Sequence, residues 1–460
     1  MIIAPKKYKN KNIAILGLGN TGISALKSFR LASARVYAWD DCEELHEEAI
    51  LLGAKIFDLS QKLWPKIDLL FVSPGIPIKH PKPHPCISIA KSKRIRITSD
   101  IEIFYEVLKE KKLSPIIIGV TGTNGKSTVT SMISHVLGSI AAGNIGKPVL
   151  ELNLENNCPI ILELSSYQLD LISKFKPTIS VLLNISPDHL ARHGSFNNYI
   201  TAKRRLFKNQ AGNDYIIIAF DDLVARKEAE RLKGLVDSPK TIHVSISRSL
   251  SKGVYVNKEG DLIDNIFAEQ FCFKNYTGKL EIIGIHNLYN SVIAYTACRF
   301  TDSQPEKIIT KITSFKGLPH RMEKVAEIKG VTFYNDSKAT NVAATDAALY
   351  NFSKVLLIAG GQYKGEKLDP LLEHSGRLLG VFLIGESKDI FAKAFSSVTK
   401  VKVSNTINNA VQDAYRKALE QTPSPSILLS PAAASFDQFK NFEERGIAFQ
   451  KAVNKLSEVI

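Results

Sequence analysis

The sequence predicts an α/β fold built as three consecutive domains. Short aliphatic and β-branched runs alternate with helical stretches along the chain, which is typical of parallel βαβ units. Most of these runs end in a polar signature that contains glycine, serine or asparagine. In open parallel sheets ligands bind outside the carboxyl ends of the strands, so these signatures lie where sites are built. A length of 460 residues is enough for about two to four domains.

The predicted strands form three groups along the chain. They cover 12–19, 34–40, 68–75 and 94–100 in the first group, 114–122, 159–166, 178–186 and 214–220 in the second, and 331–336, 354–361, 380–385 and 426–431 in the third. The polar, turn-rich stretch near 240–283 predicts antiparallel hairpins. Residues 408–421 are expected to be helical, and the charged run 109–112, followed by Pro115, is expected to be a linker.

Composition and targeting signals indicate a cytoplasmic protein. No apolar run reaches the ~18 residues that cross a bilayer. The short apolar stretch 13–18 leads into glycines and not into a signal-peptide cleavage site, so secretion is not expected. The cysteines are scattered without a C-x-x-C pair, which indicates reduced thiols and neither a disulfide nor a metal site; they are Cys42, Cys86, Cys158, Cys272 and Cys298.

The net charge is positive, since 60 Lys+Arg exceed 45 Asp+Glu by 15. Nucleic-acid binding usually requires a basic stripe or patch. Here the basic residues form short, dispersed clusters without interleaved aromatic residues. We therefore expect no nucleic-acid partner, and an anionic small-molecule substrate accounts for the same charge.

The segment GVTGTNGKST, residues 119–128, is the strongest chemical motif. It follows a predicted strand and precedes a helix, so its backbone N–H groups can cradle phosphates. Lys126 can reach the terminal phosphates and Ser127 can bind Mg²⁺. The usual G-x-x-x-x-G-K-[ST] spacing requires glycine at 120, where this chain has Val120, so the loop is a variant. A glycine turn with a chance Lys-Ser pair is the purely structural alternative.

The segment GLGNTG, residues 17–22, matches the dinucleotide-binding pattern G-x-G-x-x-G after a strand. Asp40 or Asp41 falls where a ribose-binding acid belongs. Taken alone the motif indicates NAD, but the same turn binds other nucleotides or only packs a helix on a sheet.

Two further strand ends carry candidate metal ligands. Glu163 ends the run PIILELSS, and Asp188-His189 follows TISVLLNIS. A carboxylate there can complete Mg²⁺ coordination around nucleotide phosphates. Histidine more often binds softer metals, so His189 can equally be only a hydrogen-bonding residue.

Taken together, the motifs resemble one enzyme family, the ATP-dependent Mur ligases, over about residues 12–450. The resemblance is carried, in chain order, by TGTNGKST, ELSSYQL, NISPDHLARH, YITAKRRLF, GIHNLYN, GLPHRME, NDSKATN and SPAAASFDQFKNFEERG. GLPHR followed by DSKATN and SFDQF is typical of the member that adds D-glutamate, and the D-N-P-R signature of the diaminopimelate- or lysine-adding member is missing.

The resemblance implies a domain for each substrate. It implies a Rossmann-like UDP-sugar domain at 1–99, a P-loop ATPase-like central domain at 100–317 and a Rossmann-like D-glutamate domain at 318–460. It also implies ATP, two Mg²⁺ ions and a monomer. The implied substrates are UDP-N-acetylmuramoyl-L-alanine and D-glutamate, joined through an acyl phosphate in cytoplasmic peptidoglycan precursor synthesis.

By the same resemblance each motif acquires a role. Lys126, His189, Lys203 and Arg321 would be catalytic, and Lys203 would carry a carbamate whose oxygens bind metal. The metal set would be Ser127, Glu163, His189 and Lys203. ATP would contact Gly122, Thr123, Asn124, Gly125, Lys126, Ser127, Thr128, Asn287 (adenine), Arg321 (phosphoryl group) and Asp336 (ribose). The UDP-sugar would contact Asn20, Thr21, Gly75 and Asn144, and D-glutamate would contact Lys338, Thr340, Lys364, Ser435 and Phe442.

The chain departs from the family pattern in two places. Asp41-Cys42 stands where a Thr-Arg pair often contacts uracil and phosphate. DHLARH, with Ala191 and His193, replaces the more usual D-H-M-D-R-Y. These departures concern UDP recognition and not the chemistry.

Three alternatives remain open at this point. A sibling amide ligase, including a folate-polyglutamylating enzyme, would differ in the amino acid that stimulates ADP release. A dehydrogenase would use GLGNTG for NAD(P)H. A nucleotide-binding regulator would lack catalysis, against which the set Lys126, Glu163, His189, Lys203 and Arg321 argues.

Overall fold

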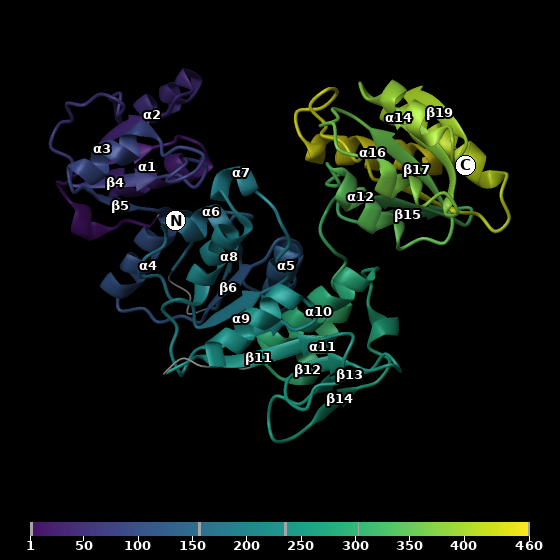
Figure 1. The fold of residues 1–460 in the computed structure, drawn as a ribbon, viewed down its shortest axis with the longest axis horizontal. Coiled ribbons are helices and arrows are strands. Elements are labelled where there is room, and N and C mark those ends of the chain that lie inside the picture. Colours follow the sequence, from purple (N-terminus) through teal and green to yellow (C-terminus); the bar gives the residue numbers. More distant parts are fainter. Residues whose placement is uncertain (1–2, 155–157, 234–236, 302, 459–460) are drawn as a thin grey trace. The chain divides into compact units, whose positions relative to one another are not determined.

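The computed structural model describes residues 3–154, 158–233, 237–301 and 303–458, and it confirms an α/β fold with three sheets (Figure 1). The chain forms two compact units. The first comprises 1–279 and 288–313 and the second comprises 280–287 and 314–460. Short 3-10 turns lie at Lys6–Tyr8, Glu43–Leu45, Val149–Glu151, Arg205–Phe207 and Thr277–Lys279.

The first sheet of the first unit is parallel, in the order β3-β2-β1-β4-β5. Side chains alternate between its two faces, so Ile13 and Ile15 belong to one apolar cluster and Ala14 and Leu16 to another. Its strands are β1 (Asn12–Leu16), β2 (Arg35–Trp39), β3 (Lys55–Ile56), β4 (Leu69–Val72) and β5 (Arg96–Thr98). Its helices are α1 (Asn20–Leu31), α2 (His46–Leu51), α3 (Pro85–Ser92) and α4 (Asp100–Glu110).

The second sheet has nine strands in the order β14-β13-β12-β11-β10-β9-β6-β8-β7. Its strands are β6 (Ile117–Thr121), β7 (Ala141–Gly143), β8 (Ile160–Glu163), β9 (Ile179–Leu182), β10 (Tyr215–Ala219), β11 (Lys240–Ser245), β12 (Val254–Val256), β13 (Leu262–Asp264) and β14 (Phe271–Phe273). Its helices are α5 (Lys126–Leu137), α6 (Ser166–Leu171), α7 (Leu190–His193), α8 (Phe196–Arg204), α9 (Leu223–Lys233), α10 (Ile285–Cys298) and α11 (Pro305–Thr313).

The hairpin prediction for 240–283 is partly wrong. β12, β13 and β14 are antiparallel as expected. β11 is instead parallel to both β10 and β12. The physical reason is the crossover through α9, which returns the chain in the same direction as β10 and places β11 beside it. Local turn content gave no sign of this longer connection.

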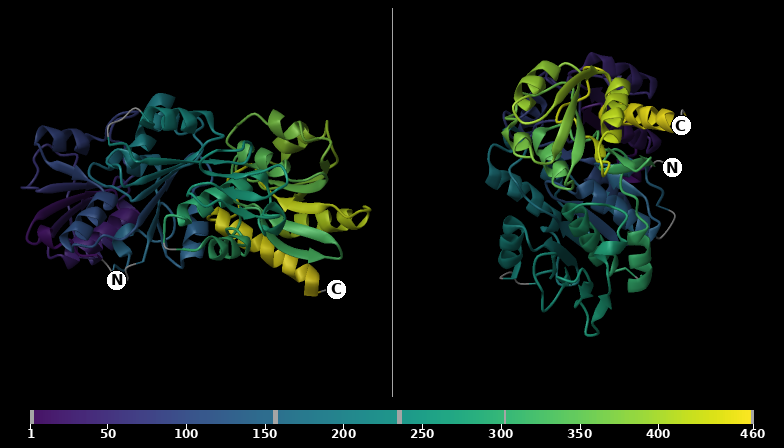
Figure 2. Two further views of the ribbon diagram at one scale, coloured as in Figure 1. Left: turned by 90° about the horizontal axis from the view of Figure 1, so that it is seen from below. Right: turned by 90° about the vertical axis from the view of Figure 1, so that its right-hand side faces the viewer.

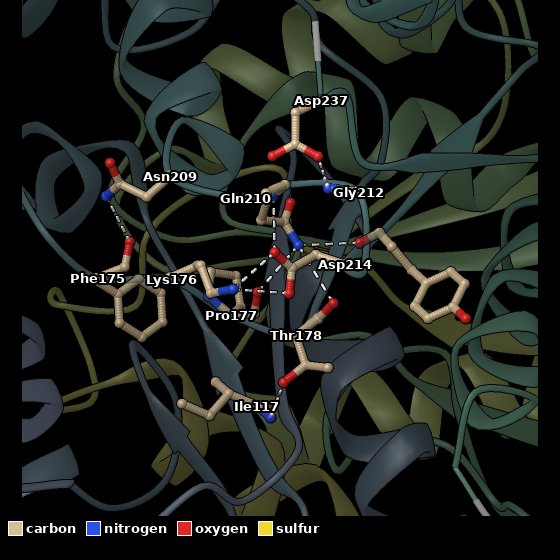
Figure 3. A network of polar contacts seen from close by, with 12 residues as sticks. Ile117, Phe175, Lys176, Pro177, Thr178, Asn209, Gln210, Gly212, Asp214 and Asp237 are labelled. Carbon is tan, nitrogen blue, oxygen red and sulfur yellow. Dashed lines mark hydrogen bonds and ion pairs between the residues drawn. The ribbon is translucent and has the colours of Figure 1, made fainter. Parts of the chain in front are cut away.

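A polar network fastens the strand starts of the second sheet (Figure 3). The amide of Gln210 donates to the carbonyl oxygens of Pro177, at 3.1 Å, and Tyr215, at 3.1 Å. The Lys176 ammonium pairs with the Asp214 carboxylate at 2.9 Å. The network joins the amino-terminal ends of β9 and β10 and leaves the opposite, carboxyl ends for the functional loops.

The sheet of the second unit has the order β15-β16-β20-β17-β18-β19, with only the β15/β16 pair antiparallel among the described strands. Helices cover both faces: α15 and α16 share one apolar cluster, and α12, α13 and α14 share the other. The long α16 is the yellow helix that leads to the C-terminus in Figure 2. The elements are β15 (Glu323–Ile328), β16 (Val331–Asn335), α12 (Val342–Leu349), β17 (Val355–Gly360), α13 (Asp369–Leu372), β18 (Leu378–Ile384), α14 (Lys388–Phe395), β19 (Val401–Asn405), α15 (Ile407–Leu419), β20 (Ser426–Leu429) and α16 (Phe442–Glu458).

One carboxylate fixes the turn between α6 and β9. Glu102 in α4 is 1% exposed, and its Oε1 accepts the backbone N–H groups of Ser173, Lys174 and Phe175 at 2.8, 2.9 and 2.7 Å. α6 begins directly after Ser165 and lies just beyond the end of β8. The anchor therefore connects α4 to a segment that carries one of the family motifs.

We predict that Glu102→Ala lowers the free energy of unfolding by about 3 kcal/mol, because three N–H groups lose a charged acceptor. Glu102→Gln keeps one acceptor oxygen and should cost roughly half as much. Urea unfolding followed by circular dichroism measures both. Glu110→Ala, on the exposed end of the same helix, is the control and should leave the midpoint unchanged. A Glu102→Ala midpoint equal to that of this control would show that the anchor is dispensable.

Candidate active site

The phosphate loop connects β6 to α5, as the sequence predicts. Gly125 has φ +85°, and a Cβ there would lie 2.6 Å from Oδ1 of Asn290, so glycine is required. The backbone N–H of Thr123 donates to Asn184 O at 2.8 Å, and that of Asn124 donates to Asn184 Oδ1 at 2.9 Å. Lys126 and Ser127 are the first residues of α5, and Thr128 follows them. The loop is thus held against the end of β9 and stands at a helix N-terminus, which favours anions.

Two lysines meet on one carbonyl oxygen of this loop. The ammonium of Lys126 donates to Gly122 O at 3.0 Å and to Thr123 O at 2.7 Å. Nζ of Lys203, which reaches the loop from α8, donates to the same Gly122 oxygen at 2.7 Å. The structure therefore brings together two residues that are 77 positions apart in the sequence (203 − 126).

Lys203 is an unusual lysine because it is 1% exposed. Burial, and then the neighbouring charge of Lys126, hold the pKa of its ammonium well below the usual value, while Asp188 acts in the opposite direction. Its Nζ also lies 4.5 Å from the ring centroid of Tyr199. The lowered pKa favours the neutral amine, which is the nucleophilic form of lysine.

Glu163 ends β8 with one carboxylate oxygen in use and one without a partner. Oε1 accepts the amide of Asn144 at 2.7 Å, and the N–H of Asn144 donates to Glu163 O at 2.9 Å. Oε2 is buried and makes no hydrogen bond within the described part of the chain. A buried carboxylate oxygen without a donor suits a cation such as Mg²⁺.

His189 lies at the start of α7 in a left-handed conformation with φ 50°. Its backbone N–H donates to Asp188 Oδ1 at 2.8 Å, and its ring lies 5.1 Å from that of Tyr167. Nearby, Nε2 of His193 lies 3.0 Å from Ser166 Oγ, and Nδ1 lies 3.5 Å from the Asp170 carboxylate. These contacts bind α7 to α6.

A cavity of about 760 Å³ joins the loop ends of both sheets of the first unit. Its wall includes the backbone of Gly17 and Gly19 from the first sheet and Ser165 to Gln168 from the second. The predicted site residues that line it are Asn20, Thr21, Gly75, Lys126, Asn144, His189 and Lys203. The cavity thus combines predicted UDP-sugar residues with the two lysines predicted to be catalytic and is large enough for a nucleotide-sized ligand.

The turn that follows β1 is held from within. Asp40 uses Oδ2 to accept the N–H of Leu18 at 2.7 Å and Oδ1 to accept that of Cys42 at 2.9 Å. Asp41 accepts from the indole of Trp39 at 3.1 Å and lies 3.1 Å from His84 Nε2. Asp40, one of the two acids that a dinucleotide site could use for ribose, therefore already accepts two backbone hydrogen bonds.

The second unit carries the remaining predicted residues, most of them in loops that follow a strand. Asp336 follows β16, and its carboxylate accepts Ser430 Oγ at 2.9 Å and the N–H of Met322 at 3.2 Å. Nζ of Lys338 lies 3.9 Å from the ring centroid of Phe442. Thr340 and Ser435 follow β16 and β20, and Lys364 follows β17. Arg321 lies in the turn that leads to β15, and the amide of Asn287 donates to Ile283 O at 2.8 Å.

Several residues of the quoted motifs take part in the geometry without having been singled out. Asn290 of GIHNLYN faces Gly125, Tyr199 of YITAKRR hydrogen-bonds Thr123 Oγ1 at 3.1 Å, and Arg445 of FEERG is buried beneath the loops of the second unit. Each of these residues belongs to a quoted motif, and that membership could have marked it as a site residue. No spacing rule assigns any of them a role.

Among the described residues, no three His, Cys, Asp or Glu side chains are arranged to hold a metal ion. Mg²⁺ commonly takes one or two carboxylates and completes its shell with phosphate oxygens and water. Over the same ranges no helix is both long and apolar enough to cross a membrane.

A glycine-rich loop between a strand and a helix N-terminus, beside the turns that end a second parallel sheet, is typical of nucleotide-binding enzymes of the multi-domain α/β class. Comparison with known families makes this specific. Residues 120–298 match the Mur ligase middle domain, and residues 320–433 match the Mur ligase glutamate ligase domain. The chain belongs to the Mur ligase family.

Individual relatives agree with this membership. The chain is 37% identical to the UDP-N-acetylmuramoylalanine--D-glutamate ligase of Caulobacter sp. strain K31 over 99% of each chain, and 36% identical to that of Rickettsia bellii over 98% and 99%. Among solved structures, UDP-N-acetylmuramate-alanine ligase MurC of Thermotoga maritima matches with a TM-score of 0.56 at 16% identity, covering 96% of this chain and 99% of that one. The match to this solved structure shows a shared fold.

We predict that stability of the second unit falls as the pH rises from 5 to 8, measured by thermal unfolding. Burial raises the pKa of Asp336 to about 7, so the folded state holds a proton that the unfolded chain releases near pH 4. This contribution is complete below about pH 4 and is lost as the pH passes about 7.

Asp336→Asn is neutral throughout and should flatten this part of the pH dependence. Its gain in melting temperature over the wild type should grow with pH. Asp389→Asn, which changes an exposed carboxylate on α14, should keep the wild-type slope. Parallel curves for all three proteins would contradict the elevated pKa.

Proposed function

We propose that this protein is an ATP-dependent ligase that joins D-glutamate to UDP-N-acetylmuramoyl-L-alanine in peptidoglycan precursor synthesis. The proposal is carried by one observation: Lys126 and Lys203 share the Gly122 carbonyl in a cavity that the UDP-sugar turn also lines. It is supported by the full-length similarity to relatives that bear this activity in their names. We further propose that the protein works as a cytoplasmic monomer.

Each domain would serve one substrate. We propose that residues 1–99 bind the UDP-sugar, with Asn20, Thr21, Gly75 and Asn144 as contacts. Residues 100–317 would bind ATP through the loop 122–128. Residues 318–460 would bind D-glutamate through Lys338, Thr340, Lys364, Ser435 and Phe442.

The chemistry is activation of a carboxylate. The alanine carboxylate attacks the terminal phosphorus of ATP, ADP leaves, and the neutral amine of D-glutamate then displaces phosphate from the acyl phosphate. Lys126, Arg321 and Lys338 would supply positive charge where negative charge accumulates, which is the main catalytic tool in phosphoryl transfer. Asn287 and Asp336 would hold the adenine and the ribose.

Magnesium fits the residues present. Two Mg²⁺ ions would be held by Ser127, Glu163, His189 and a carbamate on Lys203. The Oε2 atom of Glu163, which has no hydrogen-bond partner within the described part of the chain, supports this set. When bound, Mg²⁺ neutralises phosphate charge. The carbamate forms when the neutral Nζ of Lys203 adds to CO₂, making one N–C bond and releasing one proton.

The test is a substrate panel. Wild-type protein with UDP-N-acetylmuramoyl-L-alanine and ATP is given each candidate amino acid, and ADP release is measured. D-Glutamate alone should stimulate release. Stimulation by diaminopimelate, lysine or a folate substrate would reassign the enzyme to a sibling activity, and a change in NAD(P)H fluorescence on mixing would favour a dehydrogenase.

We predict that Lys203→Ala lowers kcat by about 100-fold or more, because the site loses an anion that orients charge in the transition state. Short carboxylic acids added to the assay should partly restore turnover by replacing the carbamate oxygens. Intact-protein mass spectrometry under CO₂ should show the extra mass on wild type only. Lys208→Ala, which changes an exposed lysine directly after the 3-10 turn Arg205–Phe207, is the control and should keep full activity. Near-wild-type turnover of Lys203→Ala would remove the carbamate from the mechanism.

A further inference from the structure

Arg445 in α16 is a buried cation outside the predicted catalytic set. The residue is 1% exposed, and no carboxylate of the described residues lies within ion-pair distance of its guanidinium. Burial lowers the pKa of Arg445 to about 10, so the group remains charged at neutral pH. A charge buried without a counter-ion is costly and needs other compensation.

The direct hydrogen bonds come from neutral oxygens of two loops, and the charge of Asp437 favours the cation from beyond ion-pair distance. Nε donates to Ser337 Oγ at 3.0 Å, and Nη2 donates to Ser337 O at 2.9 Å. Nη1 donates to the carbonyl oxygens of Ala433 and Ala434 at 3.0 and 3.2 Å. The planar fork of arginine can serve these divergent acceptors at once, which an ammonium cannot do.

The acceptors are next to the proposed D-glutamate residues in sequence. Ser337 precedes Lys338, and Ala434 precedes Ser435. The Ser337 hydroxyl donates a hydrogen bond to Phe442 O at 2.8 Å, and the Phe442 ring lies beneath the Lys338 ammonium. One side chain therefore joins the loop after β16, the loop after β20 and the start of α16.

A third loop is attached through the same carbonyl. Ala434 O also accepts the N–H of Gln362 at 2.8 Å, and Ala434 N donates to Gln362 O at 3.0 Å. Gly361 permits this approach, since a Cβ there would lie 2.3 Å from Ala434 O and 3.1 Å from Arg445 Nη1. Lys364 is two residues beyond Gln362 in that loop.

We infer that Arg445 is a positioning residue that sets the geometry of the amino-acid pocket by holding these three loops in register. It acts through Ser337, Ala434 and Phe442 and does not itself touch the amino acid. The inference rests on the proposed D-glutamate activity, because it assigns Arg445 to that pocket.

The test combines kinetics with hydrogen exchange on the full-length protein. Arg445→Lys and Arg445→Ala should raise the KM for D-glutamate at least about tenfold and the KM for ATP by a smaller factor, since all three loops carry proposed D-glutamate residues and only the loop after β16 also carries the proposed ATP contact Asp336. Added guanidinium at millimolar concentration should partly rescue Arg445→Ala. Deuterium uptake should rise in 335–341, 360–365 and 430–435. Lys451→Ala, exposed on the same helix, is the control and should match wild type.

Two results would overturn the inference. One is an unchanged KM for D-glutamate in a folded Arg445 variant. The other is uniform deuterium uptake over 314–460 with both KM values raised by the same factor and no guanidinium rescue, which would make Arg445 a stability residue only. Failure of the proposed function would be a separate result. In that case wild-type protein would show no D-glutamate-dependent ADP release. Loop-specific deuterium uptake in the Arg445 variants would still show that Arg445 holds the loops.

Discussion

The carbonyl oxygen of Gly122 accepts hydrogen bonds from two lysines, and this contact ties α5 and α8 to the loop after β6. Its position is set by the pairing of β6 with β9, where the N–H of Leu183 donates to Thr121 O at 2.9 Å. Glycine is needed at 122, because a Cβ would lie 2.6 Å from Leu183 Cβ. α5 and α8 then have to lie where both side chains can reach one atom. Two like charges on one oxygen are unfavourable, so the contact favours a neutral Lys203 or an anion beside the two lysines.

The second unit handles a buried cation by a different route. Arg445 is compensated by carbonyl and hydroxyl oxygens, each contributing a partial charge, whereas Lys203 has a single backbone acceptor. The difference matches the two side chains, because the ammonium of a buried lysine can lose its proton and a guanidinium cannot in practice. A buried lysine therefore suits a site where the side chain has to change its protonation state. A buried arginine suits a site where a constant charge has to hold the surrounding loops in one geometry.

The sequence was informative wherever a property is local. Aliphatic runs ending in polar signatures located the strands and their functional ends, as at Thr121 and Glu163, because alternation and loop chemistry depend on near neighbours. The meeting of Lys126 and Lys203 was not derivable from spacing, since it depends on how α8 packs against α6 and α7. The direction of β11, the anchor Glu102 and the fork of Arg445 were likewise missed. Each depends on a partner far away in the chain, and none has a short pattern.

Left-handed backbone conformations occur beside several of the proposed functional residues. Non-glycine residues with left-handed φ include His189 itself, His320 and Met322 on either side of Arg321, and Ala432 shortly before Ser435. Such conformations cost about 1–3 kcal/mol each and persist only where other contacts impose them. Around Arg321 the contacts are visible: the N–H of Lys338 donates to His320 O at 3.1 Å, and the N–H of Met322 donates to the Asp336 carboxylate at 3.2 Å. The loop after β16 thus holds Arg321 between two strained residues, so the proposed ribose and D-glutamate contacts and the proposed phosphoryl contact form one connected backbone structure.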